Sequence, residues 1–522
     1  MILPDPHNIF ESQPPDIKLV GFIQTPYDLS VATARTCYSS KGIITPEQVS
    51  EDDEARVLRD RIAASTREAG HLTTRQHAHF VFALSGISRS FIWEFLHNHP
   101  FYNSEQVSQR YVKVKPGNFI IPQLRSDHRY RYEKIIERQM KAYEVLIEML
   151  FPVVKSEYYQ VFPNRKSKEK KWDAVVKKKT YEIARYVLPI ATQAYLYHTV
   201  SALTLMRYVK VSQKAGVSQE QKYVVAHMLK AVLDRDPDFY KDISEVTDMA
   251  VSMNPTRGQN SAHIKSFVSA FDDRLRGRVS LLMDHNREPE KTLAHAVRTL
   301  LVKNENQLSD EAAINQVLNP SNNPDLGETL NVMTLSPLCK TLFHLHFTFS
   351  KKMSHTADSQ NQRHRMTPGS RSSLESHYYG EPDIIYPRLL KEVPTAKKLY
   401  DEVIEESVNT INHLLKEGVS FEKASYLLPN GWAVRFEESG DLLNWHHKWK
   451  LRTCYNAQEE IFYASMDELK QVAEKFPLIG KHILAPCYIR KMAGLRPFCP
   501  EGDRYCGVPV WKQEIQDYQR VI

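Results

Sequence analysis

The stretch HAHFVF at residues 77–82 decides the fold, because a near copy of it, HLHFTF, stands at residues 344–349. Three further landmarks recur in the same order along the chain: Ala34-Arg35-Thr36 with Val297-Arg298-Thr299, His97-Asn98-His99 with Arg363-His364-Arg365, and ARYVLP (184–189) with ASYLLP (424–429). Four landmarks in the same order indicate a duplicated domain. A chain of 522 residues is also longer than one hydrophobic core usually organises.

We therefore predict two tandem copies of one domain. The first covers residues 1–284 and ends in a helical extension. The second covers residues 285–522, carries the Arg-His-Arg triplet and ends in a cysteine-containing tail. Two turn-rich segments are candidate boundaries, NPTRGQN (254–260) and DHNREPE (284–290).

Each copy is predicted to combine a small sheet with long helices. HAHFVFAL (77–84) and HLHFTFS (344–350) alternate aromatic with other residues, which is typical of strands with one buried face. Helical apolar spacing extends over residues 53–70, 128–150 and 394–418. The predicted class is α+β, with helices dominant.

Composition bounds the class of protein further. Hydrophobic content of 42% with 25% charged residues is that of a globular chain, and no apolar run approaches the roughly 20 residues of a membrane span. Six cysteines form no disulfide framework, so we expect a reducing cytoplasm. Cys487, Cys499 and Cys506 cluster near His482 but lack a Cys-x-x-Cys clip, so we expect a stapled or merely packed C-terminal tail rather than a metal site.

The basic residues suggest an anionic ligand. QNQRHRMTPGSRSS (360–373) gathers Arg363, Arg365 and Arg371 around His364, and guanidinium groups bind phosphate or carboxylate bidentately. The alternative is a solvated basic turn. The corresponding place in the first copy offers Ser108, Gln109 and Arg110 as a phosphate seat.

Two other stretches are rich in polar or basic residues. LNWHHKWKLRTCYNAQEEI (443–461) is predicted to be a helix that carries Asn444, Arg452, Gln458 and Glu459. The lysine-rich residues 164–180 could neutralise nucleic-acid phosphates, but such a run before a helix is more typical of a solvated face. No glycine-rich phosphate fingerprint is present. These residues alone predict a polyanion site and no reaction class.

With these residues the chain resembles the flavin-dependent thymidylate synthases, in a tandem-duplicated form. That family carries an Arg-His-Arg triplet, seven residues and a serine, usually ending as Asn-Glu-x-Ser-x-Arg-Tyr. Arg363-His364-Arg365 is followed by residues 366–372 and then Ser373. The first copy keeps the other end of the motif, with Val107 as the expected extra residue: Glu105-Gln106 and Ser108-Gln109-Arg110-Tyr111. Gly70-His71 and Ser88-Arg89 match the family's flanking residues.

Each copy departs from the family pattern, and the departures are complementary. The second copy has Glu375 and Ser425 where the first has Arg110 and Arg185. The first copy lacks both triplet arginines, and its counterpart of Arg452 falls near Ser212. We therefore expect a composite site, with plain degeneration of both copies as the rival.

The resemblance implies roles for individual residues. The triplet Arg363, His364 and Arg365, with Asn444, would bind FAD, and Gln360 and Arg452 would be catalytic. The substrate-binding residues would be Glu105, Ser108, Gln109, Arg110, Arg185 and Arg452.

The implied reaction is the methylation of dUMP to dTMP with FAD, methylenetetrahydrofolate and NADPH, without an enzymic cysteine nucleophile or a metal. The flavin would supply the chemistry while the protein binds and orients. Two alternatives stay open: a related flavin-dependent transfer onto another pyrimidine nucleotide, and a catalytically dead protein that binds a nucleotide or flavin. We expect a cytoplasmic homodimer that mimics a tetramer, with neither membrane nor nucleic acid as partner.

Overall fold

The chain folds into two compact units that do not follow its linear order. The computed structural model describes residues 3–243, 261–520 and 522, so the candidate boundary at 254–260 lies outside the described residues. Unit 1 comprises Met1–Met140, Pro189–Gly258 and Asn409–Leu428. Unit 2 comprises Lys141–Leu188, Gln259–Val408 and Pro429–Ile522. Each unit therefore contains a segment from the other half of the sequence.

Unit 1 contains a four-stranded antiparallel sheet in the order β1-β2-β4-β3. The strands are β1 (Asp16–Phe22), β2 (His79–Ser88), β3 (Asn103–Gln106) and β4 (Gln193–Ser201). Phe80, Phe82 and Leu84 alternate along β2 and are at most 1% exposed, as expected for a strand with one face in the core. On the opposite face Tyr195 and Tyr197 of β4 are 58% and 60% exposed.

Unit 2 repeats this topology in its own sheet, ordered β5-β6-β8-β7. The strands are β5 (Ser280–His285), β6 (His346–Ser354), β7 (Gly369–Arg371) and β8 (Ala433–Asp441). The predicted α+β class and the tandem duplication are thereby confirmed. Residues 284 and 285 both lie in β5, so the second sheet begins before the division expected at that point.

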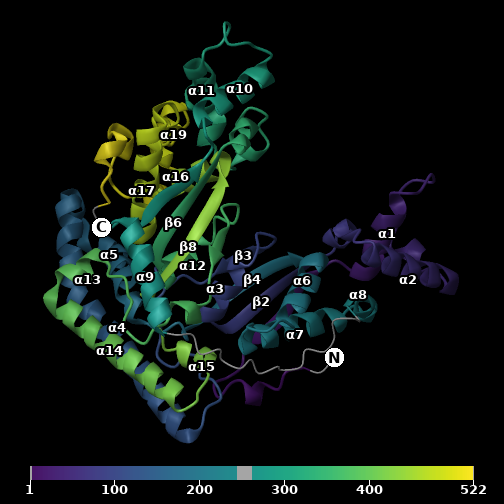
Figure 1. Ribbon diagram of the computed structural model, residues 1–522, viewed down its shortest axis with the longest axis horizontal. Coiled ribbons are helices and arrows are strands. Elements are labelled where there is room, and N and C mark those ends of the chain that lie inside the picture. The colour runs from purple at the N-terminus through teal and green to yellow at the C-terminus, as the bar shows by residue number, and fades with distance from the viewer. Residues whose placement is uncertain (1–2, 244–260, 521) are drawn as a thin grey trace. The chain divides into compact units, whose positions relative to one another are not determined.

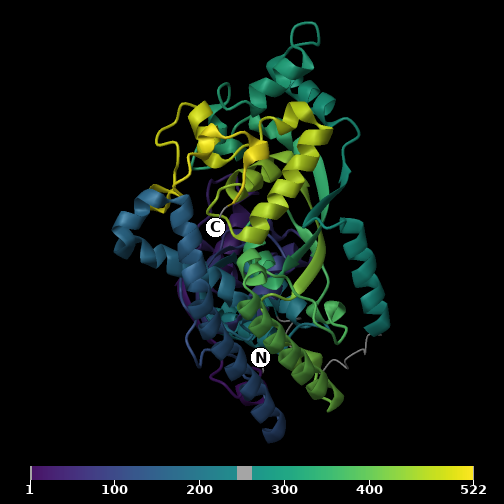
Figure 2. The ribbon, with the colours of Figure 1, turned by 90° about the vertical axis from the view of Figure 1, so that its left-hand side faces the viewer.

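Helices cover both faces of the second sheet (Figure 1). On β6, Lys351 pairs with Glu468 of α17 (Glu459–Lys475), whereas the next residue, Lys352, pairs with Asp272 of α9 (Ser261–Leu275). Because neighbouring strand residues point to opposite faces, α17 and α9 pack on opposite sides of the sheet. The C-terminal residues, yellow in Figure 2, fold back so that Tyr455 accepts from the backbone of Gln519 at 3.0 Å.

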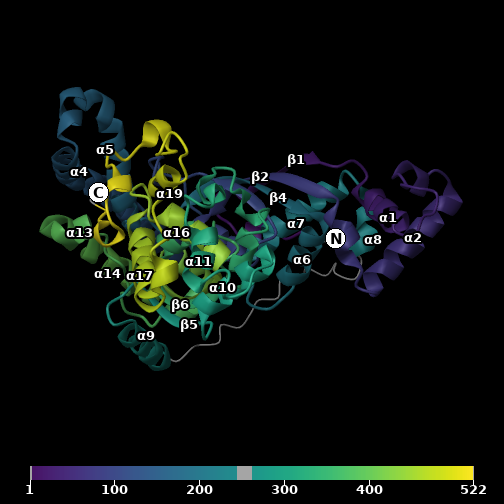
Figure 3. The ribbon, with the colours of Figure 1, turned by 90° about the horizontal axis from the view of Figure 1, so that it is seen from above.

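Within its described residues, unit 1 also contains seven α-helices of its own. They are α1 (Pro26–Thr36), α2 (Asp53–Glu68), α3 (Arg89–His97), α6 (Ala202–Ser212), α7 (Gln219–Leu233), α8 (Tyr240–Ile243) and α15 (Phe421–Ser425). Helices α1 and α2 lie side by side (Figure 3), joined by the buried ion pair of Arg59 and Asp28 at 2.7 Å.

Unit 2 contains most of the other helices. They are α5 (Glu169–Ala184), α10 (Pro289–Leu301), α11 (Asp310–Leu318), α12 (His355–Asn361), α13 (Arg388–Glu392), α16 (Leu442–Arg452), α18 (Pro477–Gly480) and α19 (Pro486–Met492). The long helices α4 (Ser126–Val161) and α14 (Pro394–Lys416) each contribute residues to both units. The helical spacing predicted over 128–150 and 394–418 is thus confirmed.

One predicted helix is wrong. Residues 443–461 were expected to form a single helix, but α16 ends at Arg452 and α17 begins at Glu459. The side chain of Gln458 accepts from the backbone N–H of Ile461 at 3.1 Å and so caps the new helix. A capping glutamine inside an apolar periodicity gives little sequence signal, since glutamine is also a good helix former.

The two copies exchange the Leu-Pro segment that precedes their inner strands. In unit 1, Ile190 and Ala191 donate backbone hydrogen bonds to Leu428 and Tyr426, at 2.9 and 3.0 Å. In unit 2, Asn430 and Gly431 donate to Leu188 and Tyr186, at 2.7 and 2.9 Å. Residues of one half of the sequence thereby complete the fold of the other half.

Candidate functional site

The Arg-His-Arg triplet lies in the turn that follows α12, between the strands β6 and β7. Arg363 is exposed, and His364 and Arg365 are half-buried. Arg452, the last residue of α16, donates from Nε to Nε2 of His364 at 2.8 Å. The structure therefore brings together two parts of the predicted site, the triplet and Arg452, that are 88 residues apart.

The charge state of His364 follows from its surroundings. Burial, followed by the charges of Arg452 and Lys448, lowers the pKa of His364 well below its usual value. The imidazole is thus neutral at physiological pH. Because Nε2 accepts from Arg452, the proton must reside on Nδ1, which fixes the tautomer and leaves the triplet with two positive charges on its guanidinium groups.

Gln360 lies in the last turn of α12, three residues before the triplet. Its Oε1 atom is buried, and it has no hydrogen-bond partner within the described part of the chain. A buried acceptor without a partner is unfavourable unless a ligand satisfies it. This atom fits the presence of a bound group with a hydrogen-bond donor beside the triplet.

Asn444 occupies the first turn of α16, where its side chain faces the helix cap. Its backbone N–H and its Nδ2 donate to the two carboxylate oxygens of Asp441, at 3.0 and 2.7 Å. Asp441 therefore holds the donor end of the amide. The role predicted for Asn444 in binding the flavin stays a prediction. In that role its Oδ1 would accept a hydrogen bond from the cofactor.

Arg371 was grouped with the triplet as a possible anion-binding residue, and its place in the structure is different. Its Nε and Nη2 donate to the two oxygens of Asp358, each at 2.7 Å, and its guanidinium lies 4.0 Å from the ring centroid of Phe436. This bidentate, stacked pair is buried and links β7 to α12. Arg371 thus has a structural role.

The first copy's motif residues lie in unit 1, on β3 and in the turn that follows it. Glu105 is exposed on β3, Ser108 is half-buried, and Gln109 and Arg110 are 5% and 8% exposed. Ser108 Oγ accepts from the backbone N–H of Arg110 at 3.3 Å. The turn has the hydroxyl, backbone N–H groups and guanidinium that a phosphate would use.

Strand register shows where the two motifs differ in length. Ser104 pairs with His198 on β4, and Gly369 pairs with Glu438, the counterpart of His198, on β8. Ser108 and Ser373 then occupy equivalent positions without any insertion between strand and serine. The extra residue of the first copy therefore lies before Ser104, and the expectation that it is Val107 is wrong.

Arg185 belongs to unit 2, although its sequence neighbours suggested the first copy's site. It is 4% exposed, and its carbonyl accepts from Nδ2 of Asn430 at 3.0 Å. Its counterpart Ser425 lies in unit 1, where its Oγ donates to the carbonyl of Glu422 at 2.9 Å. The exchange of Leu-Pro segments thus places Arg185 in the unit that carries the triplet, which the linear sequence did not indicate.

The helices α6 and α16 confirm the comparison made for Arg452. Both follow the inner strand of their sheet and both contain 11 residues. Arg452 is the last residue of α16, and the last residue of α6 is Ser212, which is 1% exposed. The first copy therefore has a buried small side chain where the second has the guanidinium that bonds to His364.

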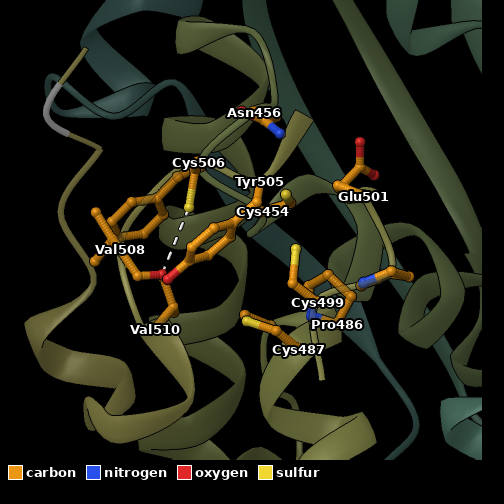
Figure 4. Close-up of a pocket in the computed structure, with 13 residues that line it drawn as sticks. Cys454, Asn456, Pro486, Cys487, Cys499, Glu501, Tyr505, Cys506, Val508 and Val510 are labelled. Carbon is orange, nitrogen blue, oxygen red and sulfur yellow. Dashed lines mark hydrogen bonds between the residues drawn. The ribbon is translucent and has the colours of Figure 1, made fainter. Parts of the chain in front are cut away.

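Four cysteines line an enclosed pocket in the C-terminal part of unit 2 (Figure 4). They are Cys454, Cys487, Cys499 and Cys506, around a space of about 10 Å³. All six cysteines of the chain are free thiols. Within residues 3–243 and 261–520, no group of three or more histidine, cysteine or acidic side chains is arranged to hold a metal ion.

A family model described as "Thymidylate synthase complementing protein" matches residues 18–238 and 281–478, one segment in each half. A flavin-dependent thymidylate synthase of Clostridium tetani is 28% identical over 229 residues, which are 43% of this chain and 85% of that protein. A flavin-dependent thymidylate synthase of Geobacter sulfurreducens is 24% identical over 230 residues, which are 43% of this chain and 92% of that protein. A third, of Saccharolobus solfataricus, is 30% identical over 156 residues, which are 29% of this chain and 58% of that protein.

Among the described helices, none combines the length and the apolar character that crossing a bilayer requires.

Proposed function

The chain belongs to the thymidylate synthase complementing protein family, whose members are methyltransferases that make thymidylate, and on that premise we propose that it converts dUMP to dTMP with FAD as its cofactor. Methylenetetrahydrofolate would supply the carbon and NADPH the reducing equivalents. The observation that carries the proposal is the intact triplet, whose His364 is bonded to Arg452.

The residues of unit 2 fit a flavin dinucleotide. Two guanidinium groups on adjacent turns of a short loop match the charge of a pyrophosphate, and the buried Oε1 of Gln360 would accept from a donor on the bound group. When bound, the flavin supplies the redox chemistry of the methyl transfer. Arg363 and Arg365 would hold it, and Gln360 would orient it.

Arg452 is proposed to act on the pyrimidine. Arg452 donates through Nε to His364, and its guanidinium carries further N–H donors of the kind that bind a carbonyl oxygen of a pyrimidine ring. Donors at that place would stabilise negative charge that develops in the ring during the reaction. Neutral His364 would hold Arg452 in this orientation without adding positive charge.

For the substrate phosphate we propose Ser108, Gln109 and Arg110 of unit 1, with Glu105 as a further contact to the nucleotide. The substrate-binding role of Arg185, which lies in unit 2 with the triplet, stays a prediction. The equivalent turn of the second copy carries Glu375, which is half-buried, and burial raises its pKa. A carboxylate there would repel a dianionic phosphate. This proposal predicts that Arg110→Ala weakens dUMP binding and leaves FAD bound, whereas Glu375→Ala changes neither.

Particular residues also favour two alternative functions, a catalytically dead binding protein and a transfer onto another pyrimidine nucleotide. Ser212 and His97-Asn98-His99 stand where the family would place arginines, and Glu375 and Ser425 do so in the second copy. Loss of residues in both copies is what a catalytically dead nucleotide- or flavin-binding protein would show. A related flavin-dependent transfer onto another pyrimidine nucleotide would require the same triplet and phosphate seat, with a different base.

The experiment that separates these functions is a product assay. Purified protein with FAD, NADPH, methylenetetrahydrofolate and dUMP is incubated, and dTMP is detected by chromatography, with each component omitted in turn. The proposal expects dTMP only in the complete mixture. Flavin binding without dTMP would favour another pyrimidine or a dead protein, and Arg452→Ala serves as the control for catalysis by a contaminant.

A further inference from the structure

A network of buried charges lies beneath the triplet in unit 2. It comprises Lys351 on β6, Glu438 on β8, Lys448 on α16 and Glu468 on α17, and none of the four side chains is more than 2% exposed. Lys351 bridges Glu438 and Glu468, each at 2.5 Å, and Lys448 contacts Glu438 at 2.5 Å. Each lysine thus contacts at least one glutamate, as the burial of ionisable groups requires.

Glu438 extends this network to the loop that carries the triplet. Thr367 Oγ1 donates to Oε1 of Glu438 at 2.8 Å, and Asn361 Nδ2 lies 3.4 and 3.3 Å from its two oxygens. Asn361 stands two residues before Arg363, and Thr367 stands two residues after Arg365. A single carboxylate therefore binds both ends of the triplet loop.

The fold itself does not require this network, because unit 1 lacks it. By strand register and helix position, Lys351, Glu438 and Lys448 correspond to Leu84, His198 and Tyr208. In unit 1 the hydroxyl of Tyr208 lies 3.0 Å from Nε2 of His198 and 2.7 Å from Nε2 of His99. The same topology thus forms with neutral groups where the triplet arginines are absent.

Electrostatics explains why Glu438 is a suitable anchor. Lys351, Lys448 and Arg371 outweigh the effect of burial and hold the pKa of Glu438 far below its usual value, so the group is a carboxylate with only accepting oxygens. Hydrogen bonds to an ionised acceptor are stronger than those between neutral groups. The donors on Asn361 and Thr367 are therefore held more firmly than a neutral residue would hold them.

The same network connects the loop to Arg452. Lys448 and Arg452 are four residues apart on α16 and so lie on one face of the helix. Lys448 contacts Glu438, and Arg452 contacts His364. Contacts from β8 and α16 thus hold both ends of the loop and its central histidine.

We propose that Glu438 is a positioning residue that fixes both ends of the loop 361–367, so that Arg363 and Arg365 are held ready for an anionic cofactor. The cofactor part of the proposal rests on the flavin binding proposed above. The positioning itself concerns the loop alone and can be measured without any ligand.

The test compares Glu438→Gln with Glu468→Gln. Both variants remove one buried carboxylate that pairs with Lys351, but Glu468 contacts Ser280, Trp449 and Lys351 and has no hydrogen bond to the loop among the described contacts. Urea unfolding measures the general loss of stability in each variant. Thr367→Val removes one bond between Glu438 and the loop, together with the contact of the same hydroxyl to the carbonyl of His364 at 3.0 Å, and leaves all four buried ionisable side chains in place.

The first readout is amide hydrogen exchange of the peptides that contain residues 361–367, in the absence of flavin. We expect at least tenfold faster exchange there in Glu438→Gln and a smaller increase in Thr367→Val, with Glu468→Gln close to the wild type. Equal exchange in the two carboxylate variants would overturn the proposal, because the effect would then be a general loss of stability.

The second readout is the FAD dissociation constant from fluorescence titration. We expect it to rise at least tenfold in Glu438→Gln and less than threefold in Glu468→Gln. A wild type that binds no FAD would contradict the proposed function and leave the exchange result to decide the positioning. Tight FAD binding by a Glu438→Gln protein with a fast-exchanging loop would contradict the link between the loop and the cofactor.

Discussion

Tyr186 donates its hydroxyl hydrogen bond to Glu460, a residue 274 positions away in the other half of the sequence. The reciprocal contact also forms: the hydroxyl of Tyr426 donates to Glu220 at 2.6 Å. Each glutamate also accepts from the serine that caps the helix after an inner strand, Ser354 or Ser88. The two contacts tie the exchanged Leu-Pro segments to the sheets that they complete.

This exchange predicts a loss of stability when either hydroxyl is removed. Tyr186→Phe and Tyr426→Phe each leave a buried carboxylate oxygen with one bond fewer, and we expect each to lower the free energy of unfolding by about 1–3 kcal/mol. Urea unfolding measures the change. Tyr195→Phe, at a side chain that is 58% exposed, is the control and should change it by less than about 0.5 kcal/mol. An equal effect of all three substitutions would refute the role given to the two contacts.

Glu94 predicts a pH dependence of stability. Burial and then the carboxylates of Glu422 and Glu220 raise its pKa to about 8, whereas the unfolded chain would have a value near 4.5. The folded protein therefore binds this proton more tightly. The free energy of unfolding should fall as the pH rises from about 4.5 to about 8, by at most about 1.4 kcal/mol per pH unit.

Glu94→Gln removes that titration, because an amide does not ionise. We expect the variant to lose stability less steeply than the wild type between pH 6 and 8 and to be the more stable of the two above that range. Urea unfolding at pH 6, 7 and 8 tests this, with the exposed Glu54→Gln as the control. Parallel slopes in wild type and Glu94→Gln would show that Glu94 is ionised in the folded state.

The cysteines should differ sharply in reactivity. Burial raises the pKa of Cys454 and Cys487 to about 12 and raises that of Cys499 and Cys506 as well, whereas Cys37 is exposed. Because the thiolate is the reactive form, we expect one thiol to react rapidly with a disulfide reagent in the native protein and six after unfolding. Cys37→Ser should abolish the rapid phase. Two or more rapid thiols in the native protein would contradict the raised pKa values of the pocket cysteines.

The duplicated architecture predicts the mass of the particle in solution. Closed two-fold dimers are the commonest oligomers, and two chains would supply four copies of the domain. Light scattering should give a mass near twice 60.5 kDa. A monomer at micromolar concentration that still binds FAD would contradict the prediction.

Much of the fold was accessible from the repeat alone. Alternation of aromatic residues in HAHFVF and HLHFTF predicted β2 and β6, and the repeat order predicted two sheets of one topology. The exchange of segments was not accessible, because Tyr186 and Tyr426 have the same local sequence environment whichever sheet they complete. Only tertiary contacts decide between the two arrangements.

The candidate site was accessible only in part. The triplet and Arg452 were identified from the family resemblance, but the hydrogen bond between Arg452 and His364 was not predicted from the sequence. Glu438 was missed because it lies outside the motif. A signal did exist, since Lys351 follows Phe347 and Phe349 on the buried face of its strand, and a lysine at a core position requires a buried partner.

The central claim is that the second copy's triplet binds the flavin. Its most direct test is the FAD bound per chain in wild type, in the double variant Arg363→Ala/Arg365→Ala and in the matched double variant His97→Ala/His99→Ala. Charge-assisted hydrogen bonds contribute about 1.5–3 kcal/mol each, so the arginine variant should bind FAD at least tenfold more weakly, and the histidine variant should differ little from the wild type. Equal flavin occupancy in the wild type and the arginine variant would contradict the claim.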